Sequence, residues 1–441
     1  MTQLWHAEHA WTSTLERDVL IEVVDGSIAT VRPDQAAPPD AIVLKGLVLP
    51  GLVNAHSHAF HRALRGRTHR NGGDFWHWRD VMYSVAAKLD PDTYFELARA
   101  TYAEMVLAGI TSVGEFHYLH HDAGGARYAD PNEMSQALLR AATEAGIRIT
   151  LIDACYLRGG MRGEALDDVQ RRFSDGDVGA WADRVAALAV SEGARIAGAI
   201  HSVRAVDRTS MKVVVDWAAD KGAPLHMHVS EQRGEVEACM QTAGMTPVEL
   251  IGEVGALGSG TTAVHATHLS GVDVELLGRS RTRVCMCPTT ERDLADGVGP
   301  ASVLIDTGAQ LCLGSDSHAV IDLFEEARAV ELDQRLATER RGLHAPEALL
   351  DAATRGGAES IGWDAGRLQV GALADFIAVD VAGPRLAGAG DDLVAAVVFA
   401  ATASDVTDVV IGGRRVVEDR KHVAVGDVGA ALGDAIGKLA T

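Results

Sequence analysis

The sequence is short of positive charge. Its 441 residues include 40 lysines plus arginines against 61 aspartates plus glutamates, for a formal net charge of -21. A surface with this balance repels phosphate groups, so we expect no nucleic-acid partner and no anionic membrane surface. A small anionic substrate remains compatible with the charge, provided that its pocket supplies arginines of its own.

Cysteine and long apolar runs are also scarce. The five cysteines are odd in number and scattered, which indicates reduced thiols rather than a disulfide framework. Cys285 and Cys287 share one face of a predicted strand and could be soft metal ligands, but without a second pair we interpret them as buried apolar residues. No uncharged apolar run approaches ~18 residues, and the N-terminal stretch lacks the regions of a signal peptide. We therefore expect a globular, cytoplasmic protein.

Both ends of the chain carry β-strand patterns. Residues 19–32 alternate β-branched residues around Asp25-Gly26, which predicts a hairpin. Residues 374–381 and 408–417 are further short strands, the second with a Gly-Gly turn. We predict that residues 1–46 and 364–441 form one small β-sandwich domain beside a central domain of residues 47–363.

The central part alternates apolar strand-like runs with helical patterns, which is typical of a parallel α/β sheet. Eight strands with intervening helices predict a (β/α)8 barrel, and an open doubly wound sheet is the alternative. The predicted strands are residues 47–58, 110–118, 147–156, 195–203, 223–231, 261–268, 282–288 and 309–316.

Residues that carry chemistry recur at the C-terminal ends of these strands. A barrel gathers all such ends at one rim, where its active site belongs, whereas an open sheet spreads them along an edge. The pattern therefore favours the barrel. The residues are His56, His58, Glu115, His117, Tyr118, His201, Arg204, His228, Glu231, His265, His268 and Asp316.

Four of these residues predict a metal site. His56 and His58 share one strand face, while His228 and Asp316 come from the fifth and eighth strands. Three imidazoles and a carboxylate suit a divalent ion, Zn²⁺ in the first place and Fe²⁺ as an alternative. A single strand histidine is more often a core residue, but the recurrence at one end is not explained that way. His226 is the competing ligand for His228. Because no lysine ends the fourth strand, we infer one ion.

Acid and base groups stand beside this set. Glu231 lies three residues after His228 and can face the ion, although its position also suits the N-terminus of a helix. His265 ends the sixth strand and can orient a hydroxide, and Asp316 can accept the proton of a water molecule. We predict Glu231, His265 and Asp316 as the catalytic residues.

Two long connections follow the first and third strands. Residues 59–84 are rich in histidine, arginine and tryptophan, and residues 156–179 are polar and rich in glycine. Loops of this length over a barrel rim are usually lids or substrate-binding segments.

These motifs resemble the amidohydrolase superfamily. The resemblance rests on HSH after an apolar strand, H-x-x-E, a later histidine, SDSH and the closing G-x-L-x-x-G-x-x-A-D-F of residues 366–376. It implies a (β/α)8 barrel with a flanking β-sandwich, and hydrolytic loss of ammonia from a C–N centre.

A set of longer motifs between residues 50 and 318 resembles one family in particular, the formimidoylglutamate deiminases of histidine degradation. The motifs are HAFHRALRG, FWHWRDVMY, EFHYLHH, HSVRAV, HVSEQ, VHATH and CPTTERDLADG. The resemblance implies the metal ligands and catalytic residues named above, and substrate contacts at Arg79, Tyr118, His201 and Arg204. It also places His61 at a substrate contact where the family usually carries glutamine.

The leading hypothesis is therefore hydrolysis of N-formimino-L-glutamate, a small dicarboxylate, by a cytoplasmic homodimer. Its two carboxylates need guanidinium partners, for which Arg79 and Arg204 are the candidates. The alternatives are an aminohydrolase of a purine, pterin or triazine-like ring, and an inactive metal-binding scaffold on the same barrel.

Overall fold

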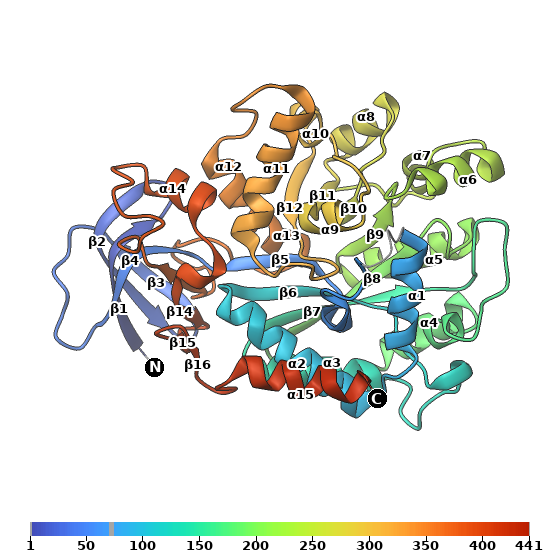
Figure 1. Cartoon of the computed structure of the whole chain (residues 1–441), viewed down its shortest axis with the longest axis horizontal. Coiled ribbons are helices and arrows are strands. Elements are labelled where there is room, and N and C mark those ends of the chain that lie inside the picture. Colours follow the sequence, from blue (N-terminus) through green and yellow to red (C-terminus); the bar gives the residue numbers. More distant parts are fainter. Residues whose placement is uncertain (1, 70–74, 441) are drawn as a thin grey trace.

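The computed structural model describes residues 2–69 and 75–440 of the chain. Within these residues the strands form two eight-stranded sheets, which lie side by side in Figure 1. One sheet, the barrel sheet, is parallel throughout and keeps sequence order from β5 to β12. Its strands are β5 (Leu52–Ser57), β6 (Ile110–His117), β7 (Arg148–Cys155), β8 (Ala194–Ser202), β9 (Leu225–Val229), β10 (Thr261–His265), β11 (Arg283–Met286) and β12 (Gln310–Leu313).

The first and last strands of this sheet approach each other, and a parallel bridge pairs Ser57 with Asp316. Across this seam the amide of Asp316 donates to the carbonyl of His56 over 3.0 Å. The prediction of a (β/α)8 barrel is confirmed, and the open sheet is excluded.

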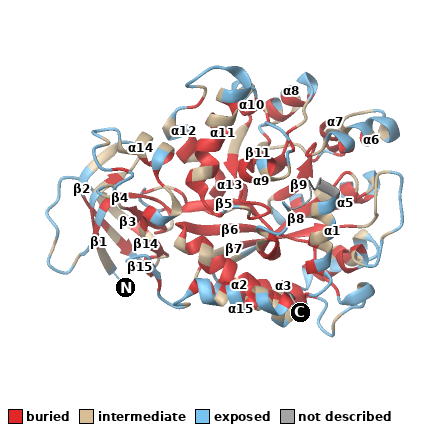
Figure 2. Ribbon diagram, in the orientation of Figure 1, coloured by how far each residue is buried: buried red, intermediate tan, exposed pale blue. Residues whose placement is uncertain are grey.

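Helices surround the barrel, and its strands are buried on both faces (Figure 2). Local sequence sets their ends. The helix α2, for example, begins with Pro91 after an Asp90 cap that accepts from the amide of Thr93. None of the described helices has the length and hydropathy needed to cross a lipid bilayer. The helices around the barrel are α2 (Pro91–Leu107), α3 (Glu133–Ala145), α4 (Val178–Ala186), α5 (Arg208–Lys221), α6 (Arg233–Ala243), α7 (Pro247–Glu253), α8 (Gly271–Ser280), α9 (Pro288–Asp293), α10 (Ala301–Asp306), α11 (Leu323–Thr338), α12 (Pro346–Asp351) and α13 (Gly357–Ser360).

The other sheet, the terminal sheet, combines strands from both ends of the chain. It has a hydrophobic core of its own, in which the rings of Trp5 and Phe376 meet edge to face at 5.4 Å. The predicted hairpin is confirmed, because Asp25 and Gly26 turn the chain with φ of 48° and 80°. In spatial order the strands are β16 (Lys421–His422), β15 (Arg414–Glu418), β14 (Val406–Ile411), β13 (Phe376–Val379), β4 (Ile42–Pro50), β1 (Thr2–Trp11), β2 (Leu15–Val24) and β3 (Ser27–Arg32).

The prediction that residues 47–58 form a single barrel strand was wrong, because two strands, β4 and β5, share this segment. Residues 47–50 belong to β4 and pair with β13 of the terminal sheet, and the barrel strand starts only at Leu52. Gly51 permits this change of sheet, because a Cβ there would lie 2.3 Å from the hydroxyl of Thr111. The expected domain boundary after residue 46 falls inside β4, so we propose a division at Gly51. Residues 408–417 likewise form two strands, β14 and β15.

The last part of the chain returns to the barrel. Helix α15 (Val428–Ala440) packs against α2, where Lys438 pairs with Glu96 over 2.7 Å, and it runs along the lower edge of Figure 1. Helix α14 (Leu393–Ala400) packs against α11 and α12. Both helices fall in the segment that the sequence assigned to the small β domain, yet both contact helices of the barrel.

The two long connections contain short helices. The first holds η1 (Ala59–Leu64) and α1 (Phe75–Ala86), and its residues 70–74 lie outside the described residues. The second holds the turn η3 (Gln170–Phe173). Side chains of both connections reach the cavity described below.

Candidate metal centre and active site

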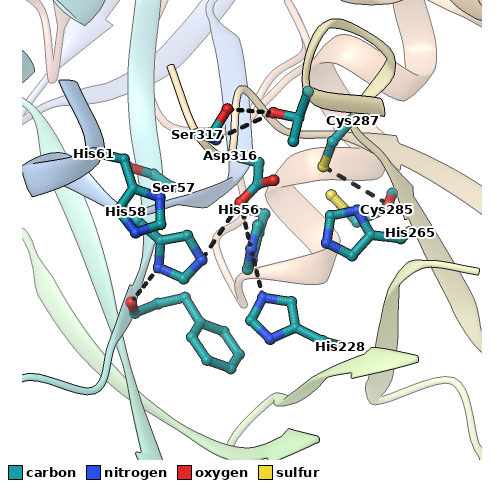
Figure 3. Close-up of polar contacts among 12 residues, drawn as sticks. His56, Ser57, His58, His61, His228, His265, Cys285, Cys287, Asp316 and Ser317 are labelled. Carbon is teal, nitrogen blue, oxygen red and sulfur yellow. Dashed lines mark hydrogen bonds and ion pairs between the residues drawn. The ribbon is translucent and has the colours of Figure 1, made fainter. Parts of the chain in front are cut away.

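The four predicted ligand residues meet at the C-terminal rim of the barrel (Figure 3). The nearest oxygen of Asp316 lies 3.3 Å from Nε2 of His56 and 3.4 Å from Nε2 of His58. Nε2 of His228 lies 3.1 Å from Nε2 of His56. One ligand atom from each of the four residues lies within 4.8 Å of every other, and all four side chains are buried.

The backbone is strained where the barrel closes around this group. Asp316 and His265 have φ of 39° and 69°, values that L-residues rarely adopt. Gly314 lets this segment come against β5, because a Cβ there would lie 2.7 Å from Cβ of His56. Strain of this kind persists where a site needs an unusual side-chain direction.

Backbone carbonyls orient two of the three histidines as neutral ligands. Nδ1 of His58 donates to the carbonyl of Phe116 over 2.9 Å, and Nδ1 of His228 donates to the carbonyl of His201 over 3.0 Å. These bonds leave both Nε2 lone pairs facing the centre of the group. Burial, and then the neighbouring His56, lower the pKa of His58 to about 3 and that of His228 well below its usual value. The donor set and its tautomers therefore fit a divalent ion, while its identity is left open.

His265 lies beside this group, between two carboxylates. Its Nε2 is 3.8 Å from Glu231 and its Nδ1 is 3.7 Å from Glu291. Burial opposes the charged form, but the charge of Glu231 and the contact with Glu291 raise the pKa of His265 to about 10. The predicted catalytic residues Glu231, His265 and Asp316 all line one cavity of about 500 Å³.

Two arginines predicted for substrate binding line the same cavity from different segments. Arg79 comes from α1 and lies over the ring of Tyr83 at 5.4 Å. Arg204 follows β8 and lies 3.2 Å from Glu235 and 3.8 Å from Glu231. Arg204 thus already has carboxylate neighbours, which the sequence did not predict.

The remaining predicted contacts line the cavity next to the metal group. Nε2 of His61 lies 2.9 Å from the hydroxyl of Tyr118, and the His61 ring packs on His58 at 4.5 Å. His201 packs on Tyr156 at 4.6 Å. His61, Tyr118 and His201 all line the cavity.

Other predicted rim residues serve elsewhere. Glu115 accepts from the hydroxyl of Ser57 over 2.6 Å and from the amide of Ala59 over 2.7 Å, so it braces the HSH segment from outside the cavity. His226 lies deeper than His228, and its Nε2 donates to the carbonyl of Ser360 over 2.9 Å. Neither His117 nor His268 is among the residues that line the cavity.

Two carboxylates of the site were missed from the sequence, Glu235 and Glu291. Glu235 stands in the first turn of α6, four residues after Glu231, which precedes the helix. Glu291 lies in the CPTTE segment, where only the fold brings it to His265.

Comparisons with known proteins agree with this geometry. The model of the Amidohydrolase family matches residues 47–416. The chain is 38% identical over 437 residues to formimidoylglutamate deiminase from Pseudomonas aeruginosa, and the match covers 96% of each chain. It is 32% identical over 422 residues to 5-methylthioadenosine/S-adenosylhomocysteine deaminase from Natronomonas pharaonis, covering 95% of this chain and 92% of the relative.

Solved structures show the same likeness. An amidohydrolase from Brucella melitensis, 33% identical, superposes with a TM-score of 0.90 over 100% of both chains. A zinc-bound adenosine deaminase from Xanthomonas campestris has a TM-score of 0.83 at 22% identity, covering 99% of this chain and 97% of that one. The second likeness is one of fold.

Proposed function

The chain belongs to the amidohydrolase family and is a hydrolase of carbon–nitrogen bonds, and we propose that it hydrolyses N-formimino-L-glutamate to N-formyl-L-glutamate and ammonia. The family is metal-dependent. A divalent ion held by His56, His58, His228 and Asp316 would act as a Lewis acid and lower the pKa of a water molecule. Our proposal for the ion is Zn²⁺, with Fe²⁺ as the alternative.

The observation that carries the proposal is the cavity itself. Its lining includes His58, His228 and Asp316 of the metal group together with Arg79 and Arg204. A substrate with two carboxylates and one hydrolysable C=N bond matches a cavity that offers two arginines beside a metal-binding group. Arg204 would then share its charge between Glu235 and a substrate carboxylate.

Residues of the metal group and beside it carry out the proton transfers. Asp316 accepts a proton from the attacking water. The hydrogen bond from His56 and the charge of His265 overcome burial and keep the pKa of Asp316 well below its usual value, so its carboxylate is ionised. His265 donates a hydrogen bond to the attacking oxygen. Glu231, 3.8 Å from His265, carries a proton to the departing nitrogen. Water oxygen joins the formimino carbon, the C=N bond breaks, and the nitrogen leaves as ammonia.

A second function has one observation in its favour. The cavity wall includes the rings of Trp78, Tyr83, Tyr118, Tyr156 and Phe173, on which a purine could stack. The relative from Natronomonas pharaonis is named as a deaminase of such a ring system. Methylthioadenosine offers the two arginines no carboxylate and S-adenosylhomocysteine offers only one, whereas N-formimino-L-glutamate offers two, so we place this function second.

Substrate comparison tests the choice directly. We expect ammonia release from N-formimino-L-glutamate at a kcat/KM at least ~100-fold above that for 5′-methylthioadenosine or adenosine. Water labelled with ¹⁸O should place the label in N-formyl-L-glutamate, whereas cleavage of the other C–N bond would give L-glutamate and formamide. Faster turnover of the nucleosides would reverse the order of the two functions.

Variants test the roles of Arg79 in substrate binding and of Glu231 in proton transfer. Arg79→Met should raise KM for the dicarboxylate, whereas the matched change at the exposed Arg67 should not. Glu231→Gln should keep its metal and lose ~10²–10⁴-fold in kcat, the usual contribution of acid–base catalysis. Near-normal turnover by Glu231→Gln would remove Glu231 from the proton transfer.

A role in histidine degradation and a cytoplasmic homodimer complete the proposal. The five cysteines are unpaired and buried, which suits a reducing compartment. Sedimentation analysis of the purified protein measures the number of subunits.

A further inference from the structure

We propose that His265, Cys287 and Asp316 form a second cation site, for a thiophilic ion such as Cd²⁺ or excess Zn²⁺, whose occupancy inhibits the enzyme. The three residues follow or end β10, β11 and β12, which are neighbours in the barrel. One ligand atom from each lies within 4.8 Å of the other two, and all three side chains are buried. Asp316 belongs to this group and to the four-residue group as well.

The ligand atoms are available. Figure 3 shows the carboxylate of Asp316 lying between His58 on one side and His265 with Cys287 on the other. Within the described part of the chain, Nδ1 of His265 is buried without a hydrogen bond, and the carboxylate of Glu291 lies 3.7 Å from it. The thiol of Cys287 makes weak contacts with Cys285, 4.0 Å to its carbonyl and a further one to its side chain.

The surroundings favour a cation. Glu231 and Glu291 lie 3.8 and 3.7 Å from the ring nitrogens of His265. Together with Asp316 they place three buried carboxylates around the site. An ion bound here takes the place of the protons on the Cys287 thiol and the His265 ring.

The donor set selects the class of ion. A thiolate, an imidazole and a carboxylate suit Zn²⁺, Cd²⁺ and similar borderline or soft ions, and they disfavour Mg²⁺ and Ca²⁺, which prefer oxygen ligands. Many enzyme active sites hold two ions about 3.5–4 Å apart, and Asp316 belongs to both groups here.

Inhibition follows from the position and rests on the function proposed above. An ion on His265 and Asp316 removes the two groups that orient the attacking water and accept its proton. His265 and Asp316 line the substrate cavity, so the ion can enter and leave through it. The inhibition should therefore reverse when the free ion is buffered away.

Cadmium binding to the holoenzyme tests the site without substrate. Equilibrium dialysis with metal analysis should show that wild type keeps its resident ion and gains one Cd²⁺. A cadmium–thiolate charge-transfer absorption should appear with the same binding curve. Cys287→Ser should weaken this binding at least ~10-fold, as expected when a soft ligand is lost, and should retain basal activity. Cys285→Ser, a matched change at a buried thiol outside the group, should bind as wild type.

Several outcomes would overturn the proposal. These are no added Cd²⁺ in wild type, one-for-one exchange with the resident ion, or unchanged binding in Cys287→Ser. Cys287→Ala serves as the second variant if the serine variant is poorly folded, as judged by thermal unfolding. Because binding is measured without substrate, failure of the formiminoglutamate assay would leave this result standing.

Discussion

Two groups of histidines and carboxylates lie on opposite sides of strand β6, and only one of them faces the cavity. Phe116 points inward, with its ring 4.5 Å from that of His228. The next residue, His117, points outward, with its ring 4.7 Å from that of His120. His117, His120 and Asp153 offer ligand atoms within 4.8 Å of one another, just as the inner group does.

The outer group differs in how its carboxylate is neutralised. Both oxygens of Asp153 accept from Arg184 over 2.8 Å, and one also accepts from the indole of Trp181 over 3.0 Å. In the described part of the chain Asp316 pairs with histidines, and no arginine or lysine forms an ion pair with it. A fixed guanidinium takes the place that a metal ion would need.

The comparison shows that ligand geometry alone does not define a metal centre. Both groups are buried and both have neutral histidines, since burial and then Arg184 lower the pKa of His120 to about 4. In the described part of the chain, the inner group is distinguished by a carboxylate without an arginine or lysine partner and by access from a cavity. We therefore expect the inner group to bind the ion and the outer group to hold the barrel wall.

The largest predicted difference concerns the histidines. His228→Ala should lose the bound ion and at least ~10³-fold in kcat/KM, equivalent to about 4 kcal/mol. His117→Ala, the matched change in the outer group, should keep one equivalent of metal and activity within a few-fold of wild type. Metal analysis and ammonia release measure both variants. Equal metal loss in the two would show that the outer group is also a metal site.

A smaller effect is expected from the charge that separates the groups. Arg184→Met leaves Asp153 and Asp175 buried without their partner and should lower the free energy of unfolding by about 3–5 kcal/mol. Urea unfolding measures the loss, and the metal content of the folded protein should not change. At the exposed pair Arg279–Glu275 the same substitution should cost under about 1 kcal/mol. A loss of similar size at both positions would contradict a structural role for Arg184.

The sequence predicted the barrel and the meeting of the four candidate ligands, because parallel strands bring their C-terminal ends to one rim. His56, His58, His228 and Asp316 meet for that reason. The period of two along a strand did not say which face of β6 is inward, so Glu115 and His117 were grouped with the rim. Glu291 and Arg184 could not be placed, since their partners are distant in sequence and are brought close only by the packing of helices on the barrel.

The smallest effect is expected at His61, where the family usually carries glutamine. Burial, and then His58, keep the pKa of His61 well below its usual value, so its ring is neutral, as an amide is. Its contact with the Tyr118 hydroxyl, 2.9 Å long, is within reach of a glutamine amide. His61→Gln should therefore change kcat/KM by less than ~10-fold, because one neutral hydrogen bond is worth about 0.5–1.5 kcal/mol. A double-mutant cycle with Tyr118→Phe isolates this bond, since His61→Gln should lose its remaining effect once the hydroxyl is gone. An effect that persists in the cycle would mean that His61 acts on the metal group through its packing against His58 rather than through Tyr118.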